Sequence, residues 1–265
     1  MTRVATALLE AHLSVSYRDR GPVLRGLDMA VEPGEILGLA GQSGSGKSTL
    51  ALALLRLLDP LQAKVEGWIR FGNHDLLKLP EGELRKMRGR NIALILQSAM
   101  SSLNPRMRVG AQIREAWQVH RGREGDWLEE ARLALAGVGL RCDDWLLRRY
   151  PAELSVGMAQ RVLIAMGVLH HPALLIADEP TSALDLVTQS ELLKLFRHLN
   201  AVHGTAILFI THDLSAAITL CHRIAVLADG AIVETAASQE ILAQPRHPYT
   251  RRLVEALPRL HEAAV

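Results

Sequence analysis

The chain has 265 residues, of which 49% are hydrophobic and 22% charged, and its formal net charge is +2. This is the balance of a globular protein with a large core, and it argues against extended disorder. So small a charge gives no electrostatic reason to expect a nucleic-acid partner. The cysteines, Cys142 and Cys221, show neither metal-ligand spacing nor a disulfide framework, so we interpret them as structural thiols.

No stretch of 18 uninterrupted apolar residues is present, since Arg56 interrupts one apolar run and Asp178 ends another. At the N-terminus a single arginine, Arg3, precedes a short apolar run, which is too weak a pattern for a secretory signal. We therefore expect a cytoplasmic protein whose contact with a membrane depends on a protein partner.

The first third of the chain has the pattern of strands separated by polar turns. The expected strands lie at residues 8–17, 23–31, 36–40, 65–71 and 92–96, and a short basic helix lies at residues 81–88. Apolar residues alternate in the first two strands, which predicts an antiparallel hairpin. The strands at 36–40 and 92–96 are continuously apolar, as is typical of the middle of a parallel sheet.

Residues 98–161 change to a helical period, which we interpret as a helical insertion. Alternating strands and helices then return. The expected strands lie at 173–177, 206–210 and 224–227, and the expected helices at 187–201, 214–220, 239–243 and 250–257. The pattern predicts an α/β protein with a mainly parallel sheet flanked by helices and an N-terminal antiparallel β subdomain. We divide it into a core (1–97 and 162–234), a helical subdomain (98–161) and a C-terminal helical tail (235–265).

Residues 41–49 match the phosphate-binding pattern G-x-x-x-x-G-K-[ST] at every fixed position. They lie between the apolar strand at 36–40 and a helix expected at 48–58, which is the context the motif requires. We expect Gly41, Gly44 and Gly46 to adopt φ values closed to other residues and to bring N–H groups against phosphate oxygens. The alternative is a Gly/Ser linker that contains a lysine by chance.

We predict that the whole loop contacts nucleotide, with the positive end of the following helix adding to the attraction for phosphate. The predicted binding residues are Gly41, Gln42, Ser43, Gly44, Ser45, Gly46, Lys47, Ser48 and Thr49. Lys47 is expected to reach the β- and γ-phosphates, and the Ser48 hydroxyl to bind Mg²⁺.

Three further strands end in polar side chains. Asp178 and Glu179 follow the strand at 173–177, where Asp178 can hold Mg²⁺ and Glu179 can polarise the water that attacks the γ-phosphate. Gln97 and His212 follow two other strands, at the edge where open α/β sheets bind ligands. We expect these ends to lie side by side above the phosphate loop, although each residue alone is compatible with an ordinary surface position.

Two outlying features complete the predicted site. Tyr17 ends the first strand, where it is either a stacking surface for adenine or simply an exposed aromatic residue. Ser155 is expected to cap a helix that runs to about Leu169, and with Gly157 it would form a second anion-binding device. The alternative for this segment is an ordinary capped helix.

With these features in this order, the chain resembles the ATP-binding subunit of ABC transporters over nearly its whole length. The most diagnostic pairing is that of residues 154–160 with residues 178–185. The resemblance implies a P-loop (RecA-like) core that binds ATP and Mg²⁺. It assigns catalysis to Glu179, His212, Gln97 and Lys47, and the metal to Ser48, Gln97 and Asp178.

The same resemblance implies that two such subunits close head to tail around two ATP molecules. Ser155 and Gly157 of one chain would then face the phosphate loop of the other, and Asp185 resembles the family's cross-interface aspartate. The chain departs from the family at Val156, where glycine is usual, and at Met158, where glutamine is common. A β-branched side chain at residue 156 would loosen a phosphate contact, so the two sites would differ, which favours a heterodimer with a related ATPase.

Residues 101–105 and 246–250 are similar to the peptide and nickel importer branch of this family. That branch implies ATP-driven closure coupled to two membrane permeases, with an extracytoplasmic binding protein acting indirectly. It implies a peripheral position on the cytoplasmic face of the inner membrane. Peptide and nickel or metal chelate both stay open as substrates. The alternatives are a soluble ABC-type accessory ATPase without a permease, for example in a phosphonate pathway, and a binding-only module, which the presence of Lys47 and Glu179 disfavours.

Overall fold

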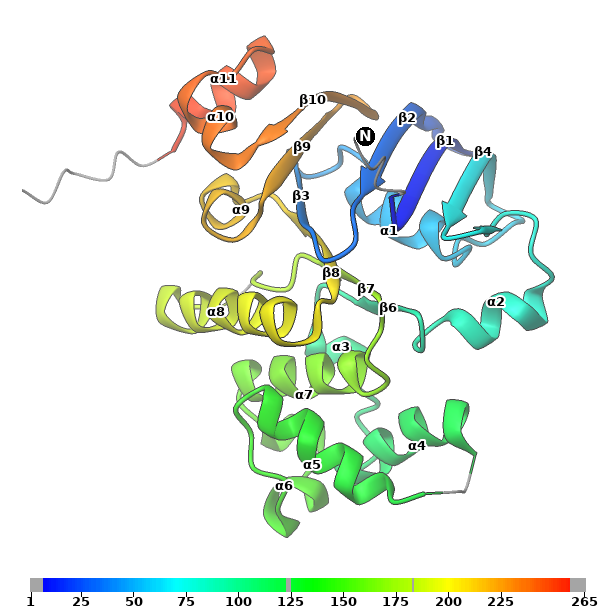
Figure 1. The fold of residues 1–265 in the computed structure, drawn as a ribbon, viewed down its shortest axis with the longest axis vertical. Coiled ribbons are helices and arrows are strands. Elements are labelled where there is room, and N and C mark those ends of the chain that lie inside the picture. The colour runs from blue at the N-terminus through cyan, green and yellow to red at the C-terminus, as the bar shows by residue number, and fades with distance from the viewer. Residues whose placement is uncertain (1–6, 123–124, 183, 258–265) are drawn as a thin grey trace, which may run out of the picture.

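The computed structural model describes residues 7–122, 125–182 and 184–257, and its strands form two sheets (Figure 1). The parts of the predicted domains at residues 1–6 and 258–265 lie outside the described residues. The smaller sheet has the order β2-β1-β4-β5. Its strands are β1 (Leu9–Tyr17), β2 (Gly21–Val31), β4 (Ala63–Phe71) and β5 (His74–Asp75). The predicted hairpin is confirmed, because β1 and β2 pair antiparallel from Leu9 with Val31 to Tyr17 with Gly21.

The larger sheet has the order β10-β9-β3-β8-β7-β6. Its strands are β3 (Ile36–Ala40), β6 (Ile92–Ile95), β7 (Leu174–Asp178), β8 (Ala206–Thr211), β9 (Arg223–Ala228) and β10 (Ala231–Ala237). The neighbours pair in parallel except for β9 and β10, which are antiparallel. Because β3, β8, β7 and β6 are consecutive, their carboxyl ends lie next to one another at one edge.

Strand β10 was not predicted from the sequence, and the helical tail predicted to begin at residue 235 begins instead at Ser238. The strand follows the turn Asp229-Gly230, in which both residues have positive φ, 49° and 79°. This pair is a strong signal for a tight hairpin, and it could have predicted the returning strand.

The central strands are buried on both faces. In β8, Ala206, Leu208 and Ile210 belong to a core that contains residues of helix α1 (Lys47–Leu54) and the smaller sheet, whereas Ile207 and Phe209 belong to a second core on the opposite face. Double-sided burial explains why these strands are continuously apolar in sequence.

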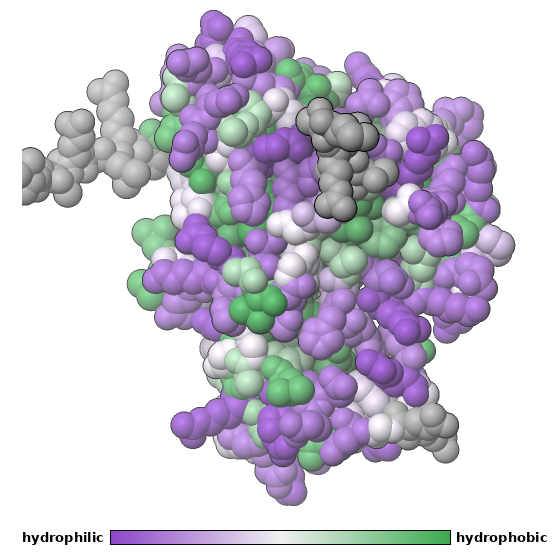
Figure 2. Space-filling model, in the orientation of Figure 1, coloured by the Kyte–Doolittle hydropathy of each residue, from purple (hydrophilic) through white to green (hydrophobic). Residues whose placement is uncertain are grey.

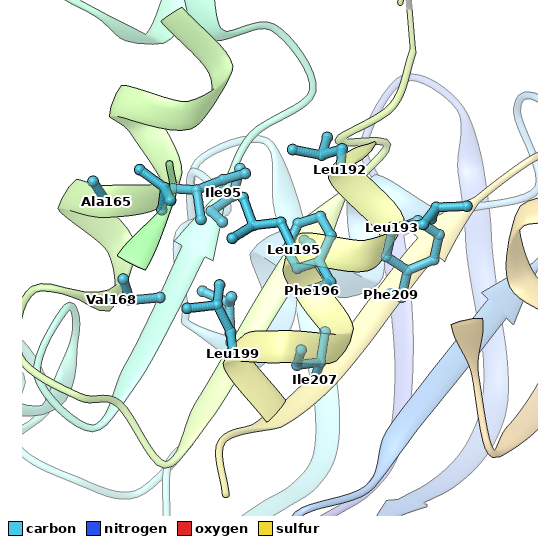
Figure 3. Packing of buried hydrophobic residues seen from close by; sticks show 14 of the residues in the cluster. Ile95, Ala165, Val168, Leu192, Leu193, Leu195, Phe196, Leu199, Ile207 and Phe209 are labelled. Atoms are coloured by element: carbon cyan, nitrogen blue, oxygen red, sulfur yellow. The ribbon is translucent and has the colours of Figure 1, made fainter. Parts of the chain in front are cut away.

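The remaining helices are α2 (Glu81–Met87), α3 (Ala99–Ser102), α4 (Val109–Arg121), α5 (Trp127–Gly137), α6 (Asp144–Arg148), the 3-10 turn η1 (Pro151–Glu153), α7 (Val156–Val168), α8 (Leu186–His203), α9 (Leu214–Leu220), α10 (Ser238–Ala243) and α11 (Pro248–Glu255). As expected, the described residues of the segment 98–161 contain helices and no strand. Helix α8 packs on the sheet through residues at helical spacing, and its Phe196 meets Phe209 of β8 edge to face at 5.7 Å (Figure 3).

Helix α1 is shorter than predicted, because it ends at Leu54 rather than near Leu58. Arg56 adopts a left-handed φ of 52°, which a continuing helix does not allow. Its guanidinium donates hydrogen bonds to the carbonyls of Leu76 and Leu79, at 3.2 and 2.6 Å. These contacts with a distant segment account for the early end of the helix.

Hydrophilic residues predominate on the face shown in Figure 2, where the hydrophobic residues are scattered and form no continuous belt. Within the described ranges, no helix is long and apolar enough to cross a lipid bilayer.

Candidate functional site

The phosphate-binding pattern forms the turn between β3 and α1, as expected. Gly44 and Gly46 have φ values of 83° and 106°, so their predicted need for a left-handed backbone is confirmed. At Gly41 that reason is wrong, because its φ is not in this region. A Cβ at Gly41 would instead lie 2.4 Å from the carbonyl oxygen of Leu227 on β9, so glycine is required there for close approach of two backbones.

Lys47, at the start of α1, is only 5% exposed. Its ammonium donates to the carbonyl oxygens of Gly41 at 2.8 Å and Gln42 at 3.0 Å, and it lies 3.6 Å from a Glu179 carboxylate oxygen. Burial lowers the pKa of Lys47, and the carboxylates of Glu179 and Asp178 oppose that shift. The loop therefore holds a desolvated cation against its own carbonyl oxygens, 3.6 Å from a carboxylate.

The polar strand ends meet as the sequence predicted, because β6, β7 and β8 are neighbours. The Glu179 carboxylate accepts hydrogen bonds from Nδ1 of His212 at 2.8 Å and from Nε2 of Gln97 at 3.4 Å. Glu179 has a φ of 47°, which is rare for a residue other than glycine and identifies a strained turn at the end of β7. This turn aims the carboxylate back toward the phosphate loop.

Asp178, the last residue of β7, is 3% exposed. Burial raises the pKa of Asp178, and a hydrogen bond from Ser48 and the charge of Lys47 counteract the shift. Within the described part of the chain its Oδ1 has no hydrogen-bond partner. A buried carboxylate oxygen beside a serine hydroxyl is a donor set suited to a hard divalent cation.

A cavity of about 730 Å³ lies over the phosphate loop. It is lined by Tyr17, Asp19, Arg20, Val23, Ser43, Gly44, Gly46, Lys47, Ser48, Thr49, Gln62, Gln97 and Glu179. Tyr17 thus lines the same cavity as the phosphate loop, as predicted. Of the predicted binding residues, Gln42 and Ser45 line a neighbouring hollow instead, and neither Ser155 nor Gly157 lines the main cavity.

Ser155 caps α7, as predicted, because its hydroxyl accepts a hydrogen bond from the backbone N–H of Met158 at 3.2 Å. The start of α7 packs against the start of α8, since a Cβ at Gly157 would lie 3.1 Å from the Thr188 methyl group. Asp185 caps α8 by accepting from the N–H groups of Val187 and Thr188, each at 3.0 Å. The two helix starts therefore form one surface, and neither lines the cavity over the chain's own phosphate loop.

The family described as "ABC transporter" matches residues 24–182, a segment that includes the phosphate loop, the start of α7 and the Asp178-Glu179 strand end. The chain belongs to the ABC transporter ATP-binding proteins. It is an ATPase that hydrolyses ATP to drive transport. Its last part, residues 233–265, matches the family described as "Oligopeptide/dipeptide transporter, C-terminal region".

Curated relatives of this ABC ATPase agree with both matches. It is 45% identical to the probable peptide ABC transporter ATP-binding protein y4tR of Sinorhizobium fredii, over 89% of this chain and 71% of the relative. It is 39% identical to the oligopeptide transport ATP-binding protein OppD of Bacillus subtilis, over 99% and 75%. It is 41% identical to the peptidoglycan transport ATP-binding protein YejF of Agrobacterium fabrum, but spans only 46% of that protein.

Solved structures share the fold. The ATP-binding cassette MJ0796, a dimer in a post-hydrolysis state bound to ADP and Pi, superposes with a TM-score of 0.75 at 26% identity, covering 87% of this chain and 98% of that one. CbiO1 of Clostridium perfringens, part of the transporter complex cbiONQ, gives the same TM-score and identity, with 96% of each chain covered. The predicted fold class is confirmed, with its antiparallel β subdomain and its mainly parallel sheet flanked by helices.

Sequence reasoning missed two residues of this ABC ATPase that contact the site. The Ser182 hydroxyl donates to the Glu179 carbonyl at 2.8 Å and lies 3.4 Å from the Gln97 carbonyl, so it ties two strand ends together. Tyr249 of α11 accepts a hydrogen bond from the backbone N–H of Gln42 at 3.0 Å. The position of Ser182 in the turn after Asp178-Glu179 could have predicted its contact. No local sequence pattern predicts the contact of Tyr249.

Proposed function

We propose that this ABC ATPase energises an importer of peptides. The observation that carries the proposal is the match of residues 233–265 to the C-terminal region of oligopeptide and dipeptide transporters. The relatives named for peptide and oligopeptide transport support it. In this role the chain is peripheral on the cytoplasmic face of the membrane, with two permease subunits and, indirectly, an extracytoplasmic binding protein.

The site residues divide the reaction among them. Glu179 accepts a proton from the attacking water, and His212 and Gln97, which hydrogen-bond to the same carboxylate, orient it. Lys47 and the loop N–H groups stabilise negative charge on the transferring phosphoryl group. Mg²⁺, held by Ser48, Gln97 and Asp178, would neutralise charge on the β- and γ-phosphates. Tyr17, on the cavity wall, would stack on adenine.

The test of the importer is association and transport. The chain should co-purify with two membrane permeases, and the reconstituted complex should take up small peptides in an ATP-dependent manner. If the complex takes up a nickel chelate and no peptide, the substrate is the metal chelate and the peptide proposal is wrong. A complex that contains no permease would favour the soluble accessory ATPase.

For the second ATPase subunit we propose a related but distinct chain. Val156 has no positive φ and is 47% exposed at the first position of α7, so its backbone is not strained. The side chain adds exposed bulk at the helix start, on the surface that would face the partner's phosphate. Val156 therefore weakens phosphate binding at the ATP site that contains the partner's phosphate loop. The other site, which contains this chain's phosphate loop, is completed by the partner's helix start, and it is not weakened if the partner has glycine at the equivalent position.

Val156→Gly should raise ATP turnover of the assembled pair about two- to fivefold, the effect of regaining one hydrogen bond. The measurement is steady-state hydrolysis after co-expression with the candidate partner. Glu179→Gln in this chain and the equivalent change in the partner should cause unequal losses of transport. Equal losses, together with no gain from Val156→Gly, would show that the valine is simply tolerated.

A further inference from the structure

The C-terminal segment is anchored firmly to the sheet before it reaches the phosphate loop. The Glu234 carboxylate on β10 accepts hydrogen bonds from the backbone N–H groups of Arg246 at 2.8 Å and His247 at 2.9 Å. Helix α10 packs on α9, β9 and β10, and its Ile241 is fully buried. Thr250 of α11 is fully buried as well. These contacts fix the position from which α11 starts (Figure 1).

The start of α11 presents one side chain to the loop. The His247 ring accepts a hydrogen bond from the N–H of Tyr249 at 3.2 Å and so caps the helix, and Pro248 occupies its first position. Tyr249 packs its ring against the core, and its hydroxyl oxygen accepts the backbone N–H of Gln42 at 3.0 Å. The residues joined by this bond are 207 positions apart in the chain.

Gln42 connects this contact to the reacting groups. Its carbonyl oxygen accepts from the Lys47 ammonium at 3.0 Å and from the Ser45 N–H at 3.2 Å. The peptide groups around Gln42 are thus held from outside by Tyr249 and from inside by the loop's lysine. The position of the Gln42 carbonyl, which sets the position of Lys47, depends on both.

The outer side of the loop faces an open hollow. A hollow of about 320 Å³ lies between residues 42–45, the Asp229-Gly230 turn and Tyr249. Side chains leave this space open beside residues 42–45. The Tyr249 hydroxyl is the contact that spans it from the C-terminal segment.

We propose that Tyr249 is a positioning residue of the ATP site, which makes the C-terminal segment part of the phosphate-binding loop's support. Its hydroxyl holds the first turn of the loop in the shape that receives phosphate. The proposal depends on the ATPase activity that the family shows, and not on the transported substrate. It explains the sequence Arg246-His247-Pro248-Tyr249-Thr250, because the backbone contacts of this segment place the Tyr249 hydroxyl against the loop.

Tyr249→Phe in the full-length chain removes the hydroxyl and keeps the ring. We expect it to raise the dissociation constant for MgATP, and KM for ATP in the assembled complex, by about three- to tenfold, as one neutral hydrogen bond would. The kcat should stay within about twofold, because the hydroxyl contacts no reacting atom. Without nucleotide, the unfolding temperature should change by no more than about 2 °C, while its rise on adding MgATP should be smaller than in the unchanged chain.

Tyr150→Phe is the matched control, since it removes the same hydroxyl from an exposed tyrosine of the helical segment. It should leave KM, the dissociation constant and both unfolding temperatures unchanged. Equal MgATP affinity in Tyr249→Phe and the unchanged chain would overturn the positioning role. The positioning role would also be overturned if Tyr249→Phe lowered the unfolding temperature without nucleotide but left KM unchanged, because Tyr249 would then be a purely structural residue. An error in the ATPase assignment itself would give a different result, because the chain without any substitution would then not bind MgATP.

Discussion

Glu179→Gln should lower ATP turnover at least about a hundredfold while MgATP binding stays close to that of the unchanged chain. The amide has the size of the carboxylate and keeps an oxygen that can accept from His212 and Gln97, which now hydrogen-bond to this side chain. It cannot accept the proton of the attacking water. The change removes the charge that lies 3.6 Å from the Lys47 ammonium, but it leaves the bonds of Lys47 to the Gly41 and Gln42 carbonyls in place, so the loop keeps its shape.

The measurement pairs single-turnover hydrolysis in the assembled transporter with a binding titration of MgATP. Glu240→Gln on α10 is the control, since Glu240 is an exposed carboxylate outside the cavity, and it should leave both quantities unchanged. Hydrolysis by Glu179→Gln near the rate of the unchanged chain would remove Glu179 from the role of base. Loss of binding together with turnover would instead make it a structural partner of Lys47.

A confirmed monomer should hydrolyse ATP roughly a hundredfold more slowly per subunit than the closed pair, because in the composite site that we propose a second chain supplies further donors to the transferring phosphate. Ser155 and Gly157 do not line the cavity of their own chain. They lie instead at the surface formed by the starts of α7 and α8. The solved relative MJ0796 is a dimer bound to ADP and Pi.

Activity per subunit should therefore rise with protein concentration, in step with the mass measured by light scattering. Ser155→Ala should lower the activity of the pair and leave MgATP binding by the single chain unchanged. Activity that is independent of concentration in a confirmed monomer would contradict the composite site.

Local sequence patterns were sufficient to predict the parallel strands of the main sheet, the hairpin and most of the candidate site. Strands buried on both faces are continuously apolar, and the phosphate loop has a fixed spacing of glycine, lysine and serine. Once β6, β7 and β8 were expected to be parallel, Gln97, Glu179 and His212 had to end at one edge, and the structure places them within hydrogen-bonding distance. Such features depend on residues close together in the chain or on a simple order of strands.

Other features were decided only by contacts between distant segments. Helix α1 ends early because the Arg56 guanidinium is held by residues 76 and 79, and Gly41 must be glycine because Leu227 of β9 approaches its backbone. Tyr249 reaches Gln42 only because β10 returns the chain beside β9, so that the start of α11 lies next to the phosphate loop. A hydrogen bond or a close backbone approach adds no periodicity to the residues that make it. The sequence around each partner therefore looks ordinary until the tertiary structure brings the two together.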